Sequence, residues 1–109
     1  MKNLILKRYG NEYPMTFNLN NYKNNGNLYI GMITNTEGYD EHWSDLTVNF
    51  ATKCEENCAY IDTNNNGDGI IAWLEEHGLG NATGKYKKSG FCWYPEFKFN
   101  MENLLQYVH

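Results

Sequence analysis

The chain has 109 residues, 41% of them hydrophobic and 16% aromatic, a composition that predicts one folded domain over residues 1–109. The net charge of −4 argues against a duplex DNA-binding surface, because such domains usually carry a basic patch on a basic domain. We expect a cytoplasmic protein without a signal peptide or membrane span, since the sequence contains no long apolar run and has an odd number of cysteines, three.

The first half of the chain predicts antiparallel strands. Leu4–Tyr9 and Tyr13–Leu19 flank Gly10-Asn11, which is typical of a hairpin, and the second run alternates apolar and polar side chains. Asn27–Thr34 is apolar on both faces and predicts a central strand. An acidic segment at 35–44 predicts an exposed loop. Two further strands are expected at Asp45–Phe50 and Cys58–Ile61.

The second half predicts two helices and an aromatic strand. Apolar residues with helical spacing between Ile70 and His77 predict a helix that Gly78 ends. We expect a loop at Gly80–Gly90 and then a strand pair, or one bent strand, over Phe91–Phe99, interrupted at Pro95. Asn100 is placed to cap a last helix, whose inward residues would be Met101, Leu104, Leu105 and Val108. The predicted class is α+β: an antiparallel sheet of four to six strands with two helices packed on one face.

The segment Asn64–Glu75, "NNNGDGIIAWLE", is similar to a calcium-binding loop. Counting from Asn64 places oxygen ligands at Asn64, Asn66, Asp68 and Glu75, with Gly69 at the sixth position. The first position lacks a charge, and the preceding residues read as a strand instead of a helix. Asn, Asp and Gly are also the residues that any turn into a helix uses. We therefore favour a turn and helix cap over Asp62–Gly69 and keep calcium as the alternative.

The cysteines give two weaker hypotheses. Cys54, Cys58, His77 and Cys92 could supply four zinc ligands, but their spacing does not match a structural zinc motif. Cys92 and His77 could form a nucleophile and base, although no local motif supports it. We expect the three cysteines to be free thiols without a catalytic or metal-binding role. We also expect no cofactor and no enzymatic activity.

Two surface clusters carry possible contacts. Lys85-Tyr86-Lys87-Lys88 is the basic cluster, where lysines beside an aromatic ring could touch a phosphate backbone. The acidic segment contains the second cluster, in which Tyr39 and Trp43 lie among Glu37, Asp40 and Glu41. Aromatic residues of this kind anchor protein interfaces, if they do not fold back on the core.

Five blocks taken in order resemble a known family: "NNGNLYIGMI", "DLTVNF", "ENCAYIDTNN", "EEHGLGNATG" and "SGFCWYPEFKF". They are similar to a small bacterial family classed as a domain of unknown function and found on conjugative plasmids, integrative elements and phages of gut Firmicutes. The resemblance spans roughly residues 25–105. It implies an accessory protein of a mobile element and supplies no catalytic motif. It also implies no family-wide calcium site, because the family lacks ligands at the positions of 66–69.

These observations lead to one principal functional expectation and two alternatives. We expect stoichiometric binding to a protein partner, most specifically inhibition of a CRISPR or restriction nuclease by the cluster at Glu37, Tyr39, Asp40, Glu41 and Trp43. The first alternative is a conjugation or nucleic-acid accessory protein that uses Lys85–Lys88. The second is calcium binding at Asn64–Glu75. The sequence leaves nucleic-acid binding and the oligomeric state open.

Overall fold

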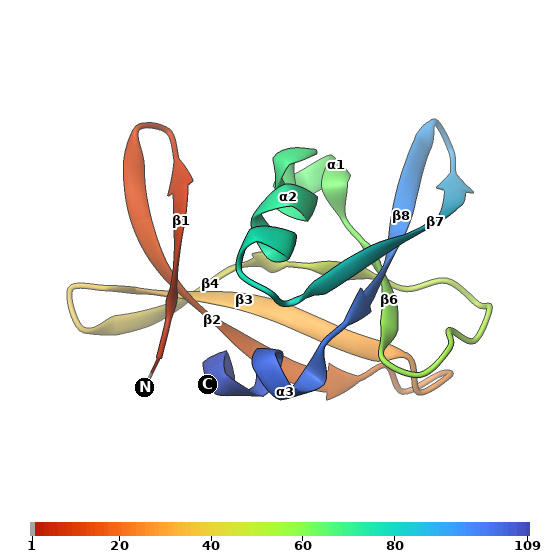
Figure 1. The fold of residues 1–109 in the computed structure, drawn as a ribbon, viewed down its shortest axis with the longest axis horizontal. Coiled ribbons are helices and arrows are strands. Elements are labelled where there is room, and N and C mark those ends of the chain that lie inside the picture. Colours follow the sequence, from red (N-terminus) through yellow and green to blue (C-terminus); the bar gives the residue numbers. More distant parts are fainter. Residues whose placement is uncertain (1) are drawn as a thin grey trace.

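A computed structural model of the chain describes residues 2–109 and contains two antiparallel sheets of four strands each (Figure 1). The first sheet has the order β1-β2-β3-β4, formed by Leu4–Arg8, Asn11–Asn21, Leu28–Thr36 and Tyr39–Asp45. The second has the order β5-β6-β8-β7, formed by Thr47–Val48, Cys58–Ile61, Cys92–Phe99 and Gly80–Ser89. The predicted α+β class with antiparallel pairing is confirmed, and the strands are divided between two sheets.

The helices are short and join the same core as the strands. α1 (Thr63–Asn66) and α2 (Gly69–Glu76) follow each other closely, and α3 (Met101–Leu104) continues as the 3₁₀ helix η1 (Leu105–Tyr107). Buried residues of α2 and α3 belong to one hydrophobic cluster with both sheets: Met15, Phe17, Ile30, Met32, Ile61, Ile70, Leu74, Phe97 and Leu104. Within residues 2–109, none of the helices has the length and apolar character needed to cross a membrane.

The predicted cap residues are confirmed. The Asp62 side chain accepts a hydrogen bond from the backbone N–H of Asn65 and so caps α1. The Asn100 side chain caps α3 in the same way, through the N–H of Asn103. Gly78, with a φ of +71°, follows the last residues of α2, in the left-handed conformation that glycine adopts without strain.

Two segments predicted as loops are hairpin strands instead. The acidic segment at 35–44 is the end of β3, a turn at Glu37-Gly38, and most of β4. The segment Gly80–Gly90 is mostly β7, which pairs with β8. Both β4 and β7 are edge strands with largely exposed side chains. Their polar sequences reflect that exposure and therefore lack the apolar alternation by which strands are recognised.

Smaller differences have local causes. The β1–β2 turn is Tyr9-Gly10, both with positive φ as a type I′ hairpin turn requires, and Asn11 already pairs with Arg8. Pro95 does not interrupt β8, because it lies opposite Tyr86 next to an irregularity in β7, where the ladder bonding is already broken. Leu105, predicted to point inward, is exposed because the chain tightens there into η1.

Candidate nucleic-acid interface

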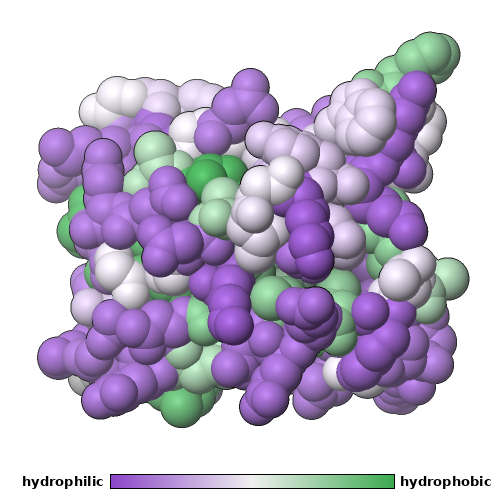
Figure 2. All heavy atoms as spheres, turned by 45° about the vertical axis from the view of Figure 1, so that its right-hand side comes forward, coloured by the Kyte–Doolittle hydropathy of each residue, from purple (hydrophilic) through white to green (hydrophobic). Residues whose placement is uncertain are grey.

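The hairpin of β7 and β8 forms a projecting arm, defined here as residues 85–94. In Figure 1 it rises away from the body of the protein, and in Figure 2 an apolar tip projects at the upper right. Gly90 (φ +62°) occupies the first turn position, where a two-residue hairpin turn favours glycine. This turn leaves the Phe91 side chain at the tip fully exposed, at 100% of its area. A large apolar side chain is thus held in solvent at the end of a two-stranded ribbon.

The arm separates positive charge from the rest of an acidic protein. Residues 77–95 contain three lysines and no carboxylate, although the whole chain has thirteen acidic and nine basic residues. Lys85 and Lys88 are exposed. The net charge of the chain therefore does not describe this surface, whose local charge is positive.

The register of the arm places its side chains on two different faces. Lys88 pairs with Trp93, and the Lys88 Nζ lies 5.6 Å from the centre of the Trp93 ring. Tyr86, two residues before Lys88, lies on the same face because side chains alternate along a strand. Trp93 is 58% exposed and Tyr86 is similarly open. This face is therefore a row of aromatic and cationic groups open to solvent.

The opposite face of the arm is turned toward the body. Lys87 pairs with Tyr94, and the Lys87 Nζ donates a hydrogen bond of 3.0 Å to the Thr52 hydroxyl. The Tyr94 ring packs against Phe50, with 5.8 Å between the ring centres. Lys87 thus anchors the arm, and the predicted cluster 85–88 divides into an open part, Lys85, Tyr86 and Lys88, and an anchored part.

The base of the arm is fixed by a buried carboxylate. The β7–β8 register shifts between Ala82 and Tyr86, and the Thr83 hydroxyl in this bulge donates a hydrogen bond of 2.8 Å to Glu96 Oε1. Glu96 is only 5% exposed. A bulge bends its strand, so the bond between Thr83 and Glu96 sets the direction in which the arm leaves the sheet.

The acidic cluster is only partly available as an interface. Tyr39 is 74% exposed, and Glu37, Asp40 and Glu41 surround it on the β3–β4 hairpin. Trp43, however, is half-buried and packs on Tyr13, with 4.7 Å between the ring centres. Trp43 therefore belongs to the edge of the core, and Tyr39 is the free aromatic residue of this cluster.

Asp40 is held in place by two partners. Its carboxylate accepts a hydrogen bond of 2.9 Å from the Asn35 side chain and also contacts the His109 ring. These two contacts, the Asn35 bond first, lower the pKa of Asp40 below its usual range. The backbone N–H of His109 donates to the carbonyl of Phe17, so the last residue of the chain ties the β3–β4 hairpin to β2.

The four residues of the calcium hypothesis have different surroundings. Asn66 is 7% exposed, and its amide group donates to the carbonyls of Asp45 and Asp62 while its oxygen accepts from the Ser44 hydroxyl. Glu75 accepts a bond from the Ala82 N–H. Asn64 and Asp68 are exposed. Two of the four candidate calcium ligands, Asn66 and Glu75, are thus already hydrogen-bonded within the protein. Residues 2–109 contain no group of three or more His, Cys, Asp or Glu side chains arranged for a metal ion.

The cysteine residues do not gather at one site: Cys54 and Cys58 lie near each other in the 53–58 segment, and Cys92 lies on the arm. Burial raises the pKa of the Cys54 and Cys58 thiols, and the Glu96 carboxylate adds to both shifts, so these thiols favour the protonated form. His77 packs on Trp73 at the end of α2, with 5.3 Å between the rings, whereas Cys92 lies beside Tyr94 on the arm. Nothing in these contacts pairs Cys92 with His77 as a nucleophile and base.

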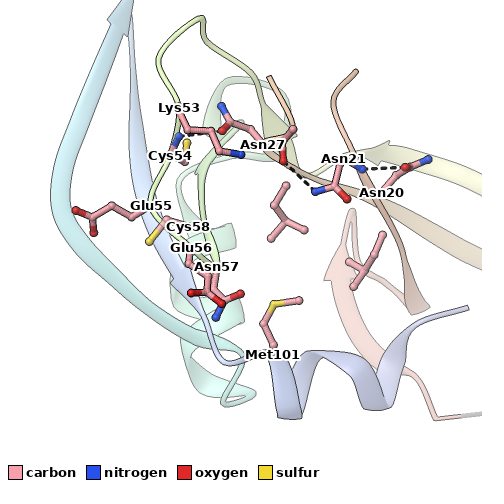
Figure 3. A pocket seen from close by; sticks show the side chains of 13 residues that line it. Asn20, Asn21, Asn27, Lys53, Cys54, Glu55, Glu56, Asn57, Cys58 and Met101 are labelled. Carbon is pink, nitrogen blue, oxygen red and sulfur yellow. Dashed lines mark hydrogen bonds between the residues drawn. The ribbon is translucent and has the colours of Figure 1, made fainter. Parts of the chain in front are cut away.

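A groove that the sequence did not reveal lies between the two sheets (Figure 3). It encloses about 580 Å³ between the end of β2, the 53–58 segment and Met101. Asn27, almost fully buried, organises one wall, because its side-chain oxygen accepts from the Cys54 N–H and its amide group donates to the Thr52 carbonyl. No sequence motif marks such a wall, since its bonds join residues about 25 positions apart.

The family comparison covers most of the chain. The model of the family described as "Domain of unknown function (DUF4313)" matches residues 16–109. No curated protein and no solved structure matches the chain significantly. The match includes β3 to η1 and most of β2, and so takes in the arm, the acidic cluster and the groove between the sheets. The chain belongs to the DUF4313 family of domains of unknown function.

Proposed function

We propose that this chain is a nucleic-acid accessory protein that binds single strands along the open face of its arm. The proposal is supported by one observation above others: Phe91 is fully exposed at the tip of a ribbon whose open face carries Trp93, Tyr86 and Lys88, and Lys85 is exposed at its base. Several exposed aromatic side chains gathered on one projecting ribbon, unlike a single exposed side chain, commonly mark a binding surface. In line with the family resemblance, we place this activity in a mobile genetic element.

The ligand class follows from the chemistry of the open face. Every nucleobase has a flat face that stacks on an aromatic ring, so a row of aromatic side chains holds an unpaired strand without reading its sequence. Lys85 and Lys88 would meet the phosphates beside those bases. A duplex keeps its bases stacked on one another and would leave the aromatic residues of the arm unused, so single strands fit this surface better.

Two lysines predict weak binding that depends on salt. Each phosphate contact to a single strand contributes about −0.7 to the slope of the logarithm of the association constant against the logarithm of salt concentration. With Lys85 and Lys88 as the contacts, the expected slope is roughly −1.4. Fluorescence anisotropy of a labelled oligothymidine and its RNA counterpart measures the affinity and the slope directly.

Substitutions on the arm test the proposal. Trp93→Ala and Phe91→Ala should each weaken binding about fivefold or more, because base stacking on an aromatic side chain contributes about 1–3 kcal/mol. Tyr39→Ala is the matched control, since Tyr39 is also an exposed aromatic residue but lies on the acidic hairpin. Absence of binding at low salt, or equal affinity of the Trp93→Ala and Tyr39→Ala variants, would refute the proposal.

The second candidate function is stoichiometric inhibition of a defence nuclease, such as a CRISPR or restriction enzyme. Its support is the exposed Tyr39 among Glu37, Asp40 and Glu41, which could enter a basic nucleic-acid channel while Tyr39 serves as the anchor. For this candidate, Tyr39→Ala is the test variant and Trp93→Ala is the control. Nuclease inhibition should saturate at a fixed molar ratio, be lost in Tyr39→Ala and persist in Trp93→Ala. Unimpaired cleavage by a panel of such nucleases at excess protein would exclude this candidate for them.

A further inference from the structure

A second groove lies where the arm meets the α1–α2 junction, on the side of the molecule where both rise in Figure 1. It measures about 340 Å³ and is lined by Thr63, Asn64, Gly67, Asp68, Cys92 and Trp93. The arm supplies one wall through Trp93, and the turn between the two helices supplies the other. It is a shallow groove open to solvent, so a group bound in it would keep part of its surface exposed.

The polar wall of this groove contains a carboxylate that the fold does not use. Asp68 precedes α2, yet its side chain makes no capping hydrogen bond. Among residues 2–109 it also takes part in none of the ion pairs, which join Lys7 to Glu12, His42 to Asp45 and His109 to Asp40. Both Asp68 and the nearby Asn64 are exposed. Their hydrogen-bonding groups are thus available to a ligand.

The charge of Asp68 selects which part of a strand can enter. A carboxylate repels phosphate, so the backbone of a bound strand would stay with Lys85 and Lys88. A base can enter instead, with its face against Trp93 and its edge toward Asp68. Proteins that take up unpaired bases commonly combine these two contacts, stacking on an aromatic ring and hydrogen bonds to the pairing edge.

The pairing edges of the four bases offer different partners to a carboxylate. Guanine presents two adjacent donors, N1–H and N2–H, which match the two oxygens of one carboxylate. Cytosine and adenine each present one amino group. Thymine and uracil present a single N–H between two carbonyl oxygens, which repel the carboxylate. We propose that this groove binds one unpaired guanine of a strand held on the arm, an inference that rests on the proposed function.

The test compares oligothymidines that carry one central substitution. In fluorescence anisotropy, a central guanine should tighten binding about fivefold over the all-thymine strand, as expected for a two-bond base contact. Inosine lacks the N2 amino group of guanine and so removes one donor. A central inosine should lose most of the gain, and a central cytosine should give little of it.

The matched variants are Asp68→Asn and Glu102→Gln. Asp68→Asn should abolish the preference for guanine while slightly strengthening binding to all-thymine strands, because it removes one negative charge near the phosphates. Glu102→Gln removes an exposed carboxylate on α3 and should leave the guanine preference intact. Equal binding of guanine, inosine and thymine strands would overturn the guanine site while leaving the arm proposal standing. Absence of binding to every strand would overturn both.

Discussion

At the scale of single residues, the sequence satisfies backbone and side-chain requirements that become visible only in the fold. Tyr9 has a φ of +54° and Glu37 a φ of +53°, so both adopt the left-handed conformation in tight hairpin turns. Each is followed by a glycine, as such turns favour. Asn66 satisfies a different requirement, because its amide joins α1 to the end of β4.

The Tyr9 turn yields a stability prediction. Tyr9→Asn should raise the free energy of unfolding by about 0.5–1 kcal/mol, because asparagine tolerates a positive φ better than tyrosine. The Tyr9 side chain is exposed and packs on little that would be lost. Urea denaturation measures the change. Tyr86→Asn is the control, since Tyr86 is also exposed but lies in a strand, where asparagine is not favoured. An equal gain in both variants would contradict the turn argument.

Asn66 distinguishes a structural amide from a calcium ligand. Asn66→Ala should lower the free energy of unfolding by about 1–3 kcal/mol, because it removes the hydrogen bonds that the buried Asn66 amide donates to the carbonyls of Asp45 and Asp62. The loss should be the same in excess chelator and in millimolar calcium. Asn64→Ala, at an exposed position, should change little in either condition. A loss seen only with calcium present would favour the metal site instead.

At the scale of elements, the direction of the arm depends on one bulge in β7. Thr83 and Glu96 face each other across the shifted register, and the second residue is buried. The bulge also accommodates Gly84 with a φ of +88°. The arm is therefore an extension of a packed sheet with a defined angle, and its base is the place where substitutions should act on it.

Thr83→Val tests the contribution of this hydrogen bond to the bulge. Valine keeps the branched shape but removes the hydroxyl donor from the buried Glu96 carboxylate, so unfolding should become easier by about 1–3 kcal/mol. Thermal or urea denaturation measures the loss. Ser89→Ala removes a hydroxyl from the exposed end of the same strand and should have an effect near zero. Equal stability of Thr83→Val and the wild type would show that the bond does not support the bulge.

At the scale of the whole molecule, the two edge hairpins carry opposite charges at separate places. The acidic β3–β4 hairpin extends at one end of the molecule, and the basic arm rises near the other (Figure 1). The acidic hairpin suits a basic partner and the arm suits an acidic one. The overall charge of −4 does not reveal the two separate surfaces. Tyr29 and Asp45 belong to the packing that holds the first of these hairpins, through a hydrogen bond of 2.6 Å.

The Tyr29 bond predicts a pH dependence. Burial, with the bond to Asp45, raises the pKa of Tyr29 to about 12 from a usual value of 10.0. The neutral form is thus favoured in the folded state. The neutral Tyr29 phenol therefore contributes its full stabilisation of the folded state below pH 10.0, and this contribution is lost as the pH rises toward about 12. Tyr29→Phe should therefore show a shallower loss of unfolding free energy across this interval.

Urea denaturation at successive pH values through that interval provides the measurement. Tyr86→Phe removes an exposed tyrosine of the arm and serves as the control for the loss of one phenol. The argument would be contradicted if Tyr29→Phe followed the wild-type curve in parallel, because the phenol would then titrate alike in both states.

The sequence by itself determined the parts of the fold that local patterns specify. The alternation in Tyr13–Leu19, the apolar spacing of α2, and the caps Asp62 and Asn100 all occur where they were predicted, since each depends on neighbours within a few residues. The same patterns indicated α+β with antiparallel pairing.

Only the tertiary structure decided which polar segments are strands and which side chains are free. The segments at 35–44 and 80–90 pair because β3 and β8 lie beside them, and that pairing depends on contacts the local sequence does not encode. Trp43 of the acidic cluster packs on Tyr13, and Lys87 of the basic cluster is bonded to Thr52. Neither side chain is therefore free to contact a partner. Phe91, read from the sequence as the beginning of a strand, is exposed because the turn at Gly90 directs it away from every other element.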